Sequence, residues 1–188
     1  MKASVYLSIV FACLSTSAFA QKENAAKVTP LSLAANSTTV EVKGNIKEGR
    51  TLSTLRWAEQ SSVACFPGTR FEMFDGNHVF YRIALPAASA MTITVTPGDS
   101  AQISLYALRQ GTSDQAVPPN VASATSCEAS YPIYANLPGG KTVKNKDDGT
   151  RKVEFTSVRA PYSILIGVAG AKGAAVGEFT LRVAVKPR

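Results

Sequence analysis

From Thr38 onward the chain repeats one pattern, in which apolar residues occupy every second position and polar residues lie between them. Successive side chains of a β-strand point to opposite faces of a sheet, so a period of two is typical of strands that bury one face. No convincing amphipathic helix interrupts the pattern. The sequence therefore predicts an all-β protein, an antiparallel β-sandwich with the two-sheet architecture of jelly-roll or immunoglobulin-like folds. The clearest expected strands are 79–85, 91–96, 103–107, 153–156, 162–168 and 179–185.

Turn-forming residues separate these stretches. Pro86, residues 97–100, residues 147–149 and the glycine-rich run 170–177 all have the composition of tight connections. We expect residues 38–188 to form one sandwich domain, preceded by an Ala-rich, loosely ordered arm over 21–37.

The first twenty residues have the features of a secretory signal peptide. Lys2 gives a positive start, residues 5–14 are largely apolar, and Ala18 and Ala20 are small residues at the positions that signal peptidase reads. We expect cleavage after Ala20 and a secreted or periplasmic product. A buried N-terminal helix is the less favoured alternative, because the flanks match the signal pattern well.

Cys13 leaves a second interpretation of the N-terminus open. The stretch ending at Cys13 loosely resembles a lipoprotein cleavage site, but Phe11 is bulky where a small residue is usual. A soluble product is favoured over a lipid-anchored one. No apolar run reaches the roughly 18 residues that a membrane-spanning helix needs, so no transmembrane segment is expected.

Removal of the signal peptide leaves Cys65 and Cys127 as a pair in an oxidising compartment. Their default interpretation is one disulfide. In the chain-entropy model, a closed loop of about 60 residues would stabilise the fold by roughly 4 kcal/mol. Two thiols and one imidazole do not make a complete zinc site, so no metal is predicted from them.

Residues 110–150 break the regular spacing of strands. This stretch holds four prolines (Pro118, Pro119, Pro132 and Pro138) and Cys127. Connections of this length are uncommon unless they are functional or disordered. Two interpretations remain open: a functional loop, or a surface insertion that the disulfide holds in place.

No catalytic constellation is evident. His78 is the only imidazole and follows a turn-like stretch, so we expect it at the surface. No nucleophile elbow accompanies it, and oxidised cysteines are not nucleophiles. The run 170–177 lacks the ending of a phosphate-binding loop. The sequence therefore predicts a protein that is not an enzyme.

The carboxylates are scattered, and we predict no cofactor. The adjacent pair Asp147 and Asp148 precedes Gly149, which is first of all a turn composition. A calcium site that uses Asp147, Asp148, Asp99 or Asp75 remains a less favoured alternative, because no calcium-loop spacing supports it.

Charge is distributed unevenly along the chain. Residues 21–140 hold nine basic and nine acidic side chains, whereas residues 141–188 hold ten basic and four acidic ones. Such a basic segment can attract acidic polysaccharide or another polyanion, or it can be a solvated face, which is the more common case. Nucleic acid is not an expected partner, because the chain is predicted to be exported and its basic residues do not alternate with aromatic residues that could stack on bases. The candidate binding residues are Lys141, Lys144, Lys146, Arg151, Lys152, Tyr131 and Tyr134.

The second half of the chain resembles the bacterial pre-peptidase C-terminal (PPC) domain family. The resemblance rests on 80–85, 91–96, 103–106, 162–168 and 177–183, which together cover about Asn77 to Val185. Residues 38–75 lie outside it, and no catalytic domain is attached. The resemblance implies a small exported β-sandwich with an accessory role.

Two functions follow as expectations. The leading one is a non-enzymatic exported module that binds an envelope polymer or a protein through the long loop and the basic segment. The alternative is an accessory, inhibitor or docking chain for an exported protease or other secreted enzyme. The oligomeric state stays open.

Overall fold

A computed structural model describes residues 26–59, 66–98, 101–121, 126–132 and 147–188. In these described ranges ten strands carry the fold, and the helices are single turns. The strands are β1 (Val28–Pro30), β2 (Thr39–Asn45), β3 (Arg50–Thr51), β4 (Asn77–Leu85), β5 (Ser89–Pro97), β6 (Ile103–Gln110), β7 (Ser126–Ser130), β8 (Arg151–Ser157), β9 (Tyr162–Gly170) and β10 (Glu178–Pro187). The helical turns are η1 (Ile46–Glu48), α1 (Arg56–Glu59), α2 (Phe66–Thr69) and η2 (Phe71–Met73).

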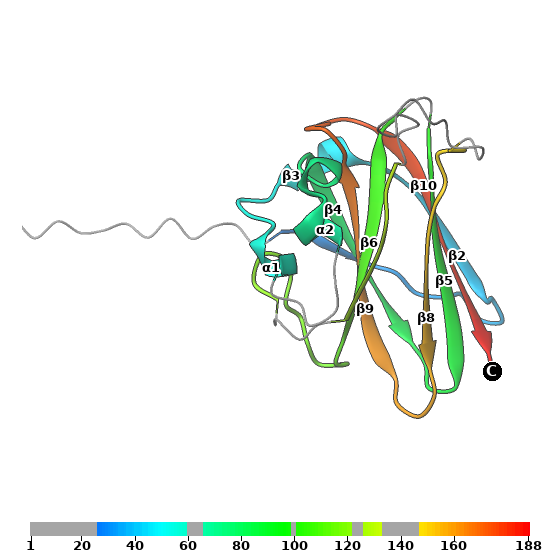
Figure 1. Ribbon diagram of the computed structural model, residues 1–188. Helices are drawn as coiled ribbons and strands as arrows, with labels where there is room; N and C mark the ends of the chain where they lie inside the picture. The colour runs from blue at the N-terminus through cyan, green and yellow to red at the C-terminus, as the bar shows by residue number, and fades with distance from the viewer. Residues whose placement is uncertain (1–25, 60–65, 99–100, 122–125, 133–146) are drawn as a thin grey trace, which may run out of the picture.

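The strands form two sheets that face each other (Figure 1). Sheet A has the order β1-β4-β9-β6-β7, with β3 also paired to β4, and sheet B has the order β2-β10-β5-β8. Every pairing is antiparallel except that of β1 with β4. The all-β, two-sheet architecture predicted from the sequence is confirmed.

The inner core lies between the sheets and follows the period-two pattern. In β8, for example, Val153 and Phe155 are buried while Lys152, Glu154 and Thr156 face solvent. Strands β5 and β10 alternate in the same way. Burial of one apolar face per strand is the hydrophobic driving force that closes the two sheets on each other.

Sheet A departs from the sequence-based expectation, because its central strands are buried on both faces. Ser104 and Tyr106 of β6, which occupy the polar phase of the pattern, are fully buried. The reason is a cap over the outer face of sheet A, made by residues 52–59 and 66–76. Figure 1 shows α1 and α2 on the side of sheet A away from sheet B. We call the buried residues under this cap the outer core: Trp57, Ala58, Met73, Phe74, Phe80, Tyr106, Leu108, Cys127, Leu165, Ala169 and Ala171.

Part of the expected N-terminal arm is built into the sandwich. Strand β1 pairs in parallel with β4, and the amide of Leu31 donates to the carbonyl of Arg82 at 2.7 Å. Leu31 and Leu33 then pack against the inner core. Residues 28–33 therefore contribute to the fold. The sequence did not predict this, because the arm shows no hydrophobic period.

No helix among the described residues is long and apolar enough to cross a membrane. The expected signal peptide, its cleavage after Ala20, and Cys13 all lie outside the described residues.

Candidate functional site

A glycine opens a slot for a tyrosine at the centre of sheet A. Gly167 of β9 lies opposite Tyr106 of β6. A Cβ atom at Gly167 would approach Cζ of the Tyr106 ring to 2.3 Å, so any larger residue would collide with the ring. The ring lies flat over this part of β9 and is held from above by Trp57, whose ring centroid is 5.5 Å away.

Substitution of this glycine tests the slot. We expect Gly167→Ala to lower the free energy of unfolding by about 2 kcal/mol, because the fully buried Tyr106 ring cannot move away without repacking the outer core. Chemical denaturation of the purified chain measures the loss. Gly111→Ala is the control, because a Cβ atom there would meet nothing within 4 Å. A Gly167→Ala protein as stable as Gly111→Ala would contradict the slot.

Tyr106 holds the only histidine of the chain. His78 Nε2 lies 2.8 Å from the main-chain carbonyl oxygen of Phe74, and Nδ1 lies 2.9 Å from the hydroxyl oxygen of Tyr106. A carbonyl can only accept, so Nε2 carries the proton and Nδ1 accepts the hydrogen bond from the tyrosine hydroxyl. Burial raises the pKa of Tyr106 well above its usual value, which keeps this hydroxyl protonated.

The environment of His78 corrects the expectation that it lies at the surface. The residue is 2% exposed, and its burial lowers its pKa to about 4. The phase of β4 explains the difference, because His78 and Phe80 share the outer face that the cap covers. Both ring nitrogens are occupied by internal partners. His78 therefore joins the cap to the sheet and presents no nitrogen for acid–base chemistry at the surface.

Tyr131 and Cys127 lie at the edge of the outer core. The Tyr131 ring packs edge-on against Phe74 at a centroid distance of 6.0 Å. Cys127 is buried on β7, opposite Leu108 of β6. Cys65 lies outside the described residues, so the Cys65–Cys127 disulfide stays a prediction. One observation favours it: α2, which begins immediately after Cys65, packs against β7.

An arginine anchors the main chain that leaves β6. Arg82 Nη1 donates to Gln110 Oε1 at 3.0 Å and to the carbonyl of Asp114, and Nη2 donates to the carbonyl of Ala116 at 3.2 Å. The Gln110 side-chain amide donates to the same Ala116 carbonyl at 2.9 Å. Residues 114–116 are therefore held against the end of sheet A. We call this the Arg82 anchor.

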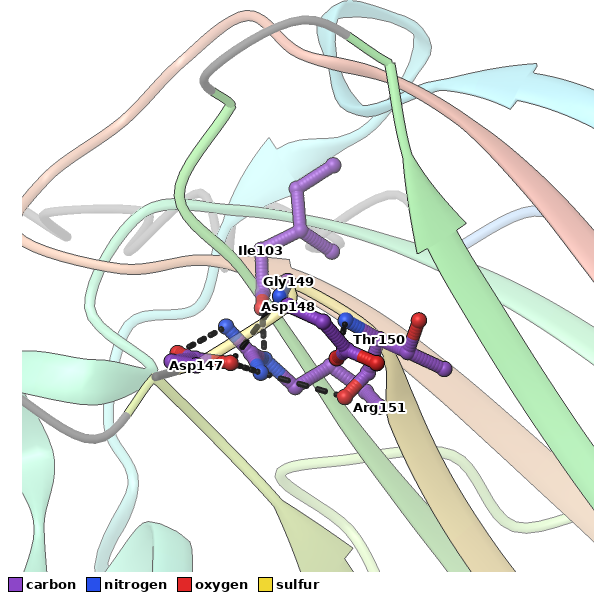
Figure 2. Close-up of polar contacts among 6 residues, drawn as sticks. All are labelled: Ile103, Asp147, Asp148, Gly149, Thr150 and Arg151. Carbon is purple, nitrogen blue, oxygen red and sulfur yellow. Dashed lines mark hydrogen bonds and ion pairs between the residues drawn. The ribbon is translucent and has the colours of Figure 1, made fainter. Parts of the chain in front are cut away.

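A second arginine anchors the main chain that enters β8 (Figure 2). Arg151 binds Asp147 through two parallel contacts, Nη1–Oδ1 at 2.7 Å and Nη2–Oδ2 at 3.0 Å. Its Nε donates to the carbonyl of Ile103 at 2.9 Å. Because Ile103 belongs to sheet A and Arg151 to sheet B, this Arg151 anchor also ties the two sheets together.

Asp147 and Asp148 form the turn that the sequence predicted. Asp147 Oδ1 accepts from the amide of Gly149 at 3.0 Å, and Asp148 Oδ1 accepts from the amide of Thr150 at 2.8 Å. Gly149 has a φ of +83°, a left-handed conformation that glycine adopts without strain. Within the described ranges, no three His, Cys, Asp or Glu side chains gather closely enough to hold a metal ion.

The predicted binding residues have different environments. Arg151 is 4% exposed and fully engaged in its anchor, so it is not available to a partner as the charge pattern suggested. Lys152 is exposed and pairs with Glu154 at 2.6 Å. Tyr131 is half-buried. Lys141, Lys144, Lys146 and Tyr134 lie outside the described residues.

Comparisons with known proteins find neither a matching family model nor a matching curated protein. Solved structures that the chain resembles include a pre-peptidase C-terminal domain of a collagenase from Bacillus anthracis, with 12% identity, a TM-score of 0.34, and coverage of 85% of this chain and 95% of that one. Another is PliG of Aeromonas hydrophila, a periplasmic lysozyme inhibitor of g-type lysozyme, with 15% identity, a TM-score of 0.39, and coverage of 85% of this chain and 96% of that one. A third is CorA, a surface-associated copper-binding protein of Methylomicrobium album, with 11% identity, a TM-score of 0.42, and coverage of 86% of this chain and 98% of that one. At these low identities and TM-scores, the likenesses say nothing of what this chain binds.

Proposed function

We propose that this chain is an exported, non-enzymatic binding module that contacts an acidic partner through the basic segment before and at the start of β8. The observation that carries the proposal is that the described main chain is fixed to the sandwich on both sides of the lysines. On one side β7 pairs with β6, and on the other side the Arg151 anchor holds Asp147.

Such an arrangement suits recognition. Binding residues are often displayed on loops that a rigid scaffold positions, because less conformational entropy is then lost on binding. Three lysines, Lys141, Lys144 and Lys146, fall between β7 and the Arg151 anchor, and Lys152 is exposed just beyond that anchor. Together with Tyr131 and Tyr134 they make the proposed contact set, without Arg151.

The partner that this charge favours is an acidic polysaccharide of the cell envelope. The alternative is a protein, in which case the chain would be an accessory, inhibitor or docking chain for an exported protease or other enzyme. Salt separates the two, because a contact made mainly of lysines and a polyanion weakens steeply as salt rises. The predicted signal peptide places either partner outside the cytoplasm.

Binding of the mature chain (Gln21 to Arg188) to alginate tests the proposal, at about 50 mM and about 500 mM salt. The key variant replaces Lys141, Lys144, Lys146 and Lys152 by Glu and keeps Arg151. The matched control replaces four exposed cations elsewhere, Lys43, Lys47, Arg159 and Lys186, by Glu, which changes the net charge equally.

We expect salt-sensitive binding that the key variant loses and the control largely retains. Equal loss in both variants would mean that net charge alone attracts the polymer. No binding by the wild type would reject the polysaccharide, and pull-down from the exported fraction would then test a protein partner.

A further inference from the structure

A small pocket at the end of sheet A has no role in the proposed surface. It has a volume of about 220 Å³ and lies where β4, the start of β9 and the connection after β6 meet. Its polar side chains include Arg82, Ser163, Thr112 and Gln115, and no carboxylate of the described part of the chain lines it. Ala84 and Tyr162 contribute to its less polar wall.

The cation in this pocket lacks a matching anion. Among the described residues Arg82 donates only to neutral acceptors: the Gln110 side-chain oxygen, the carbonyls of Asp114 and Ala116, and the hydroxyl of Ser163 at 3.1 Å. Its Nε atom is buried and has no hydrogen-bond partner. Nη2 carries two hydrogens, and one acceptor, the Ala116 carbonyl, is found for it among the described residues, so a guanidinium donor remains for a ligand.

A second donor faces the same space. Ser163 is 8% exposed and its oxygen accepts from Arg82 Nη1. The serine hydrogen has no acceptor among the described residues, so it is free to donate. An arginine and a serine that both donate, in a setting without carboxylate, form the kind of site that binds an oxyanion.

No ion pair balances the charge of Arg82 among the described residues. The only carboxylate with a marked effect on Arg82 is Asp114, whose Oδ1 accepts from the amide of Ala116. Burial lowers the pKa of Arg82 and Asp114 opposes this, but no ion pair joins the two.

The size of the pocket limits the ligand. Pockets for drug-sized molecules run from about 300 to 1,000 Å³, so this one accommodates a single small group and no oligosaccharide. We infer that the pocket binds a carboxylate carried on a small apolar group, either a free short-chain organic acid or the C-terminal residue of a peptide. The carboxylate would meet Arg82 and Ser163, and the apolar group would lie against Ala84 and Tyr162.

Matched ligands test this inference by nuclear magnetic resonance titration of the amides of Thr112, Gln115 and Ser163. The probes are isovalerate for the free acid and N-acetyl-alanyl-leucine for the peptide terminus. N-acetyl-alanyl-leucinamide has the same apolar groups without the charge. Charge-assisted hydrogen bonds favour the acid, so we expect at least about tenfold weaker binding of the amide.

Two variants locate the binding. Ala84→Trp and Thr112→Trp each place a large ring into the pocket from an exposed position, and neither side chain holds the fold. Thr156→Trp adds the same ring to the exposed face of sheet B as the control. We expect both pocket variants to abolish the shifts and the control to keep them.

The outcome also identifies the source of the carboxylate. Tighter binding of isovalerate assigns the pocket to a free acid, and tighter binding of the peptide assigns it to a chain terminus. Equal binding of the peptide and its amide, shifts that persist in both folded pocket variants, or no shifts with either acid would each overturn the inference. The lysine surface plays no part in this test, so its failure and that of the proposed function are distinguishable.

Discussion

Replacement of Arg151 by Leu is expected to lower the free energy of unfolding by about 3 kcal/mol. The substitution leaves the Ile103 carbonyl without the Arg151 donor in a buried position and removes the bidentate Arg151 contact from Asp147. Removal of one partner of a buried ion pair costs about 3–5 kcal/mol, and the lower end applies because the Asp147 side chain keeps 25% of its exposure. Urea denaturation of the mature chain at neutral pH measures the loss.

The neighbouring cation is the control for this prediction. Lys152→Leu removes an equal charge from an exposed ion pair, and such pairs contribute less than about 1 kcal/mol. If Arg151→Leu and Lys152→Leu destabilise the protein to the same small extent, Arg151 does not tie the two sheets together.

Acid is expected to destabilise the fold through His78. Its pKa is lowered from about 6.5 in the unfolded chain to about 4 in the folded one, mainly because burial disfavours the charged form. Between these values the unfolded chain binds a proton that the folded chain does not, so protons favour unfolding. Above pH 6.5 the titration of His78 does not lower the free energy of unfolding. As the pH falls from 6.5 toward 4, this titration lowers the free energy of unfolding by about 3 kcal/mol.

His78→Gln separates this effect from the titration of the carboxylates. The Gln amide can donate to the Phe74 carbonyl, and its oxygen can accept from Tyr106, but the side chain does not titrate. The variant should be less stable than wild type at pH 7 and should lose much less stability between pH 6.5 and pH 4.5. Parallel curves for the two proteins would show that His78 is not the acid-sensitive group.

The strands of sheet B could be predicted from the sequence because one rule governs them. Each has an apolar face toward the inner core and a polar face toward water, so the period of two is visible directly. The outer core could not be predicted in this way. Its cover comes from residues 52–59 and 66–76, whose single-turn helices and irregular connections carry no period of two. Its floor includes Tyr106 and Ser104, which look solvent-facing in the pattern.

Arg151 shows why charge clusters mislead. Within a run of basic residues it looks like one more exposed cation. The alternation of β8 could have indicated that Arg151 is buried, because Arg151 shares the inner face with Val153 and Phe155. It also lies four residues after Asp147, its ion-pair partner. An arginine in the buried phase of a strand needs an internal partner, and the acidic turn supplies it.

The most direct test of the central claim compares two substitutions with the same charge change. Asp147→Asn removes the carboxylate of the Arg151 anchor, whereas Asp148→Asn leaves the anchor intact and keeps the Thr150 amide bonded. Both substitutions remove one negative charge and so raise the net charge by one. Simple attraction to a polyanion would therefore tighten alginate binding in both variants. If the anchored geometry positions the lysines, Asp147→Asn should bind at least about threefold more weakly than Asp148→Asn. Equal or tighter binding by Asp147→Asn would contradict the account.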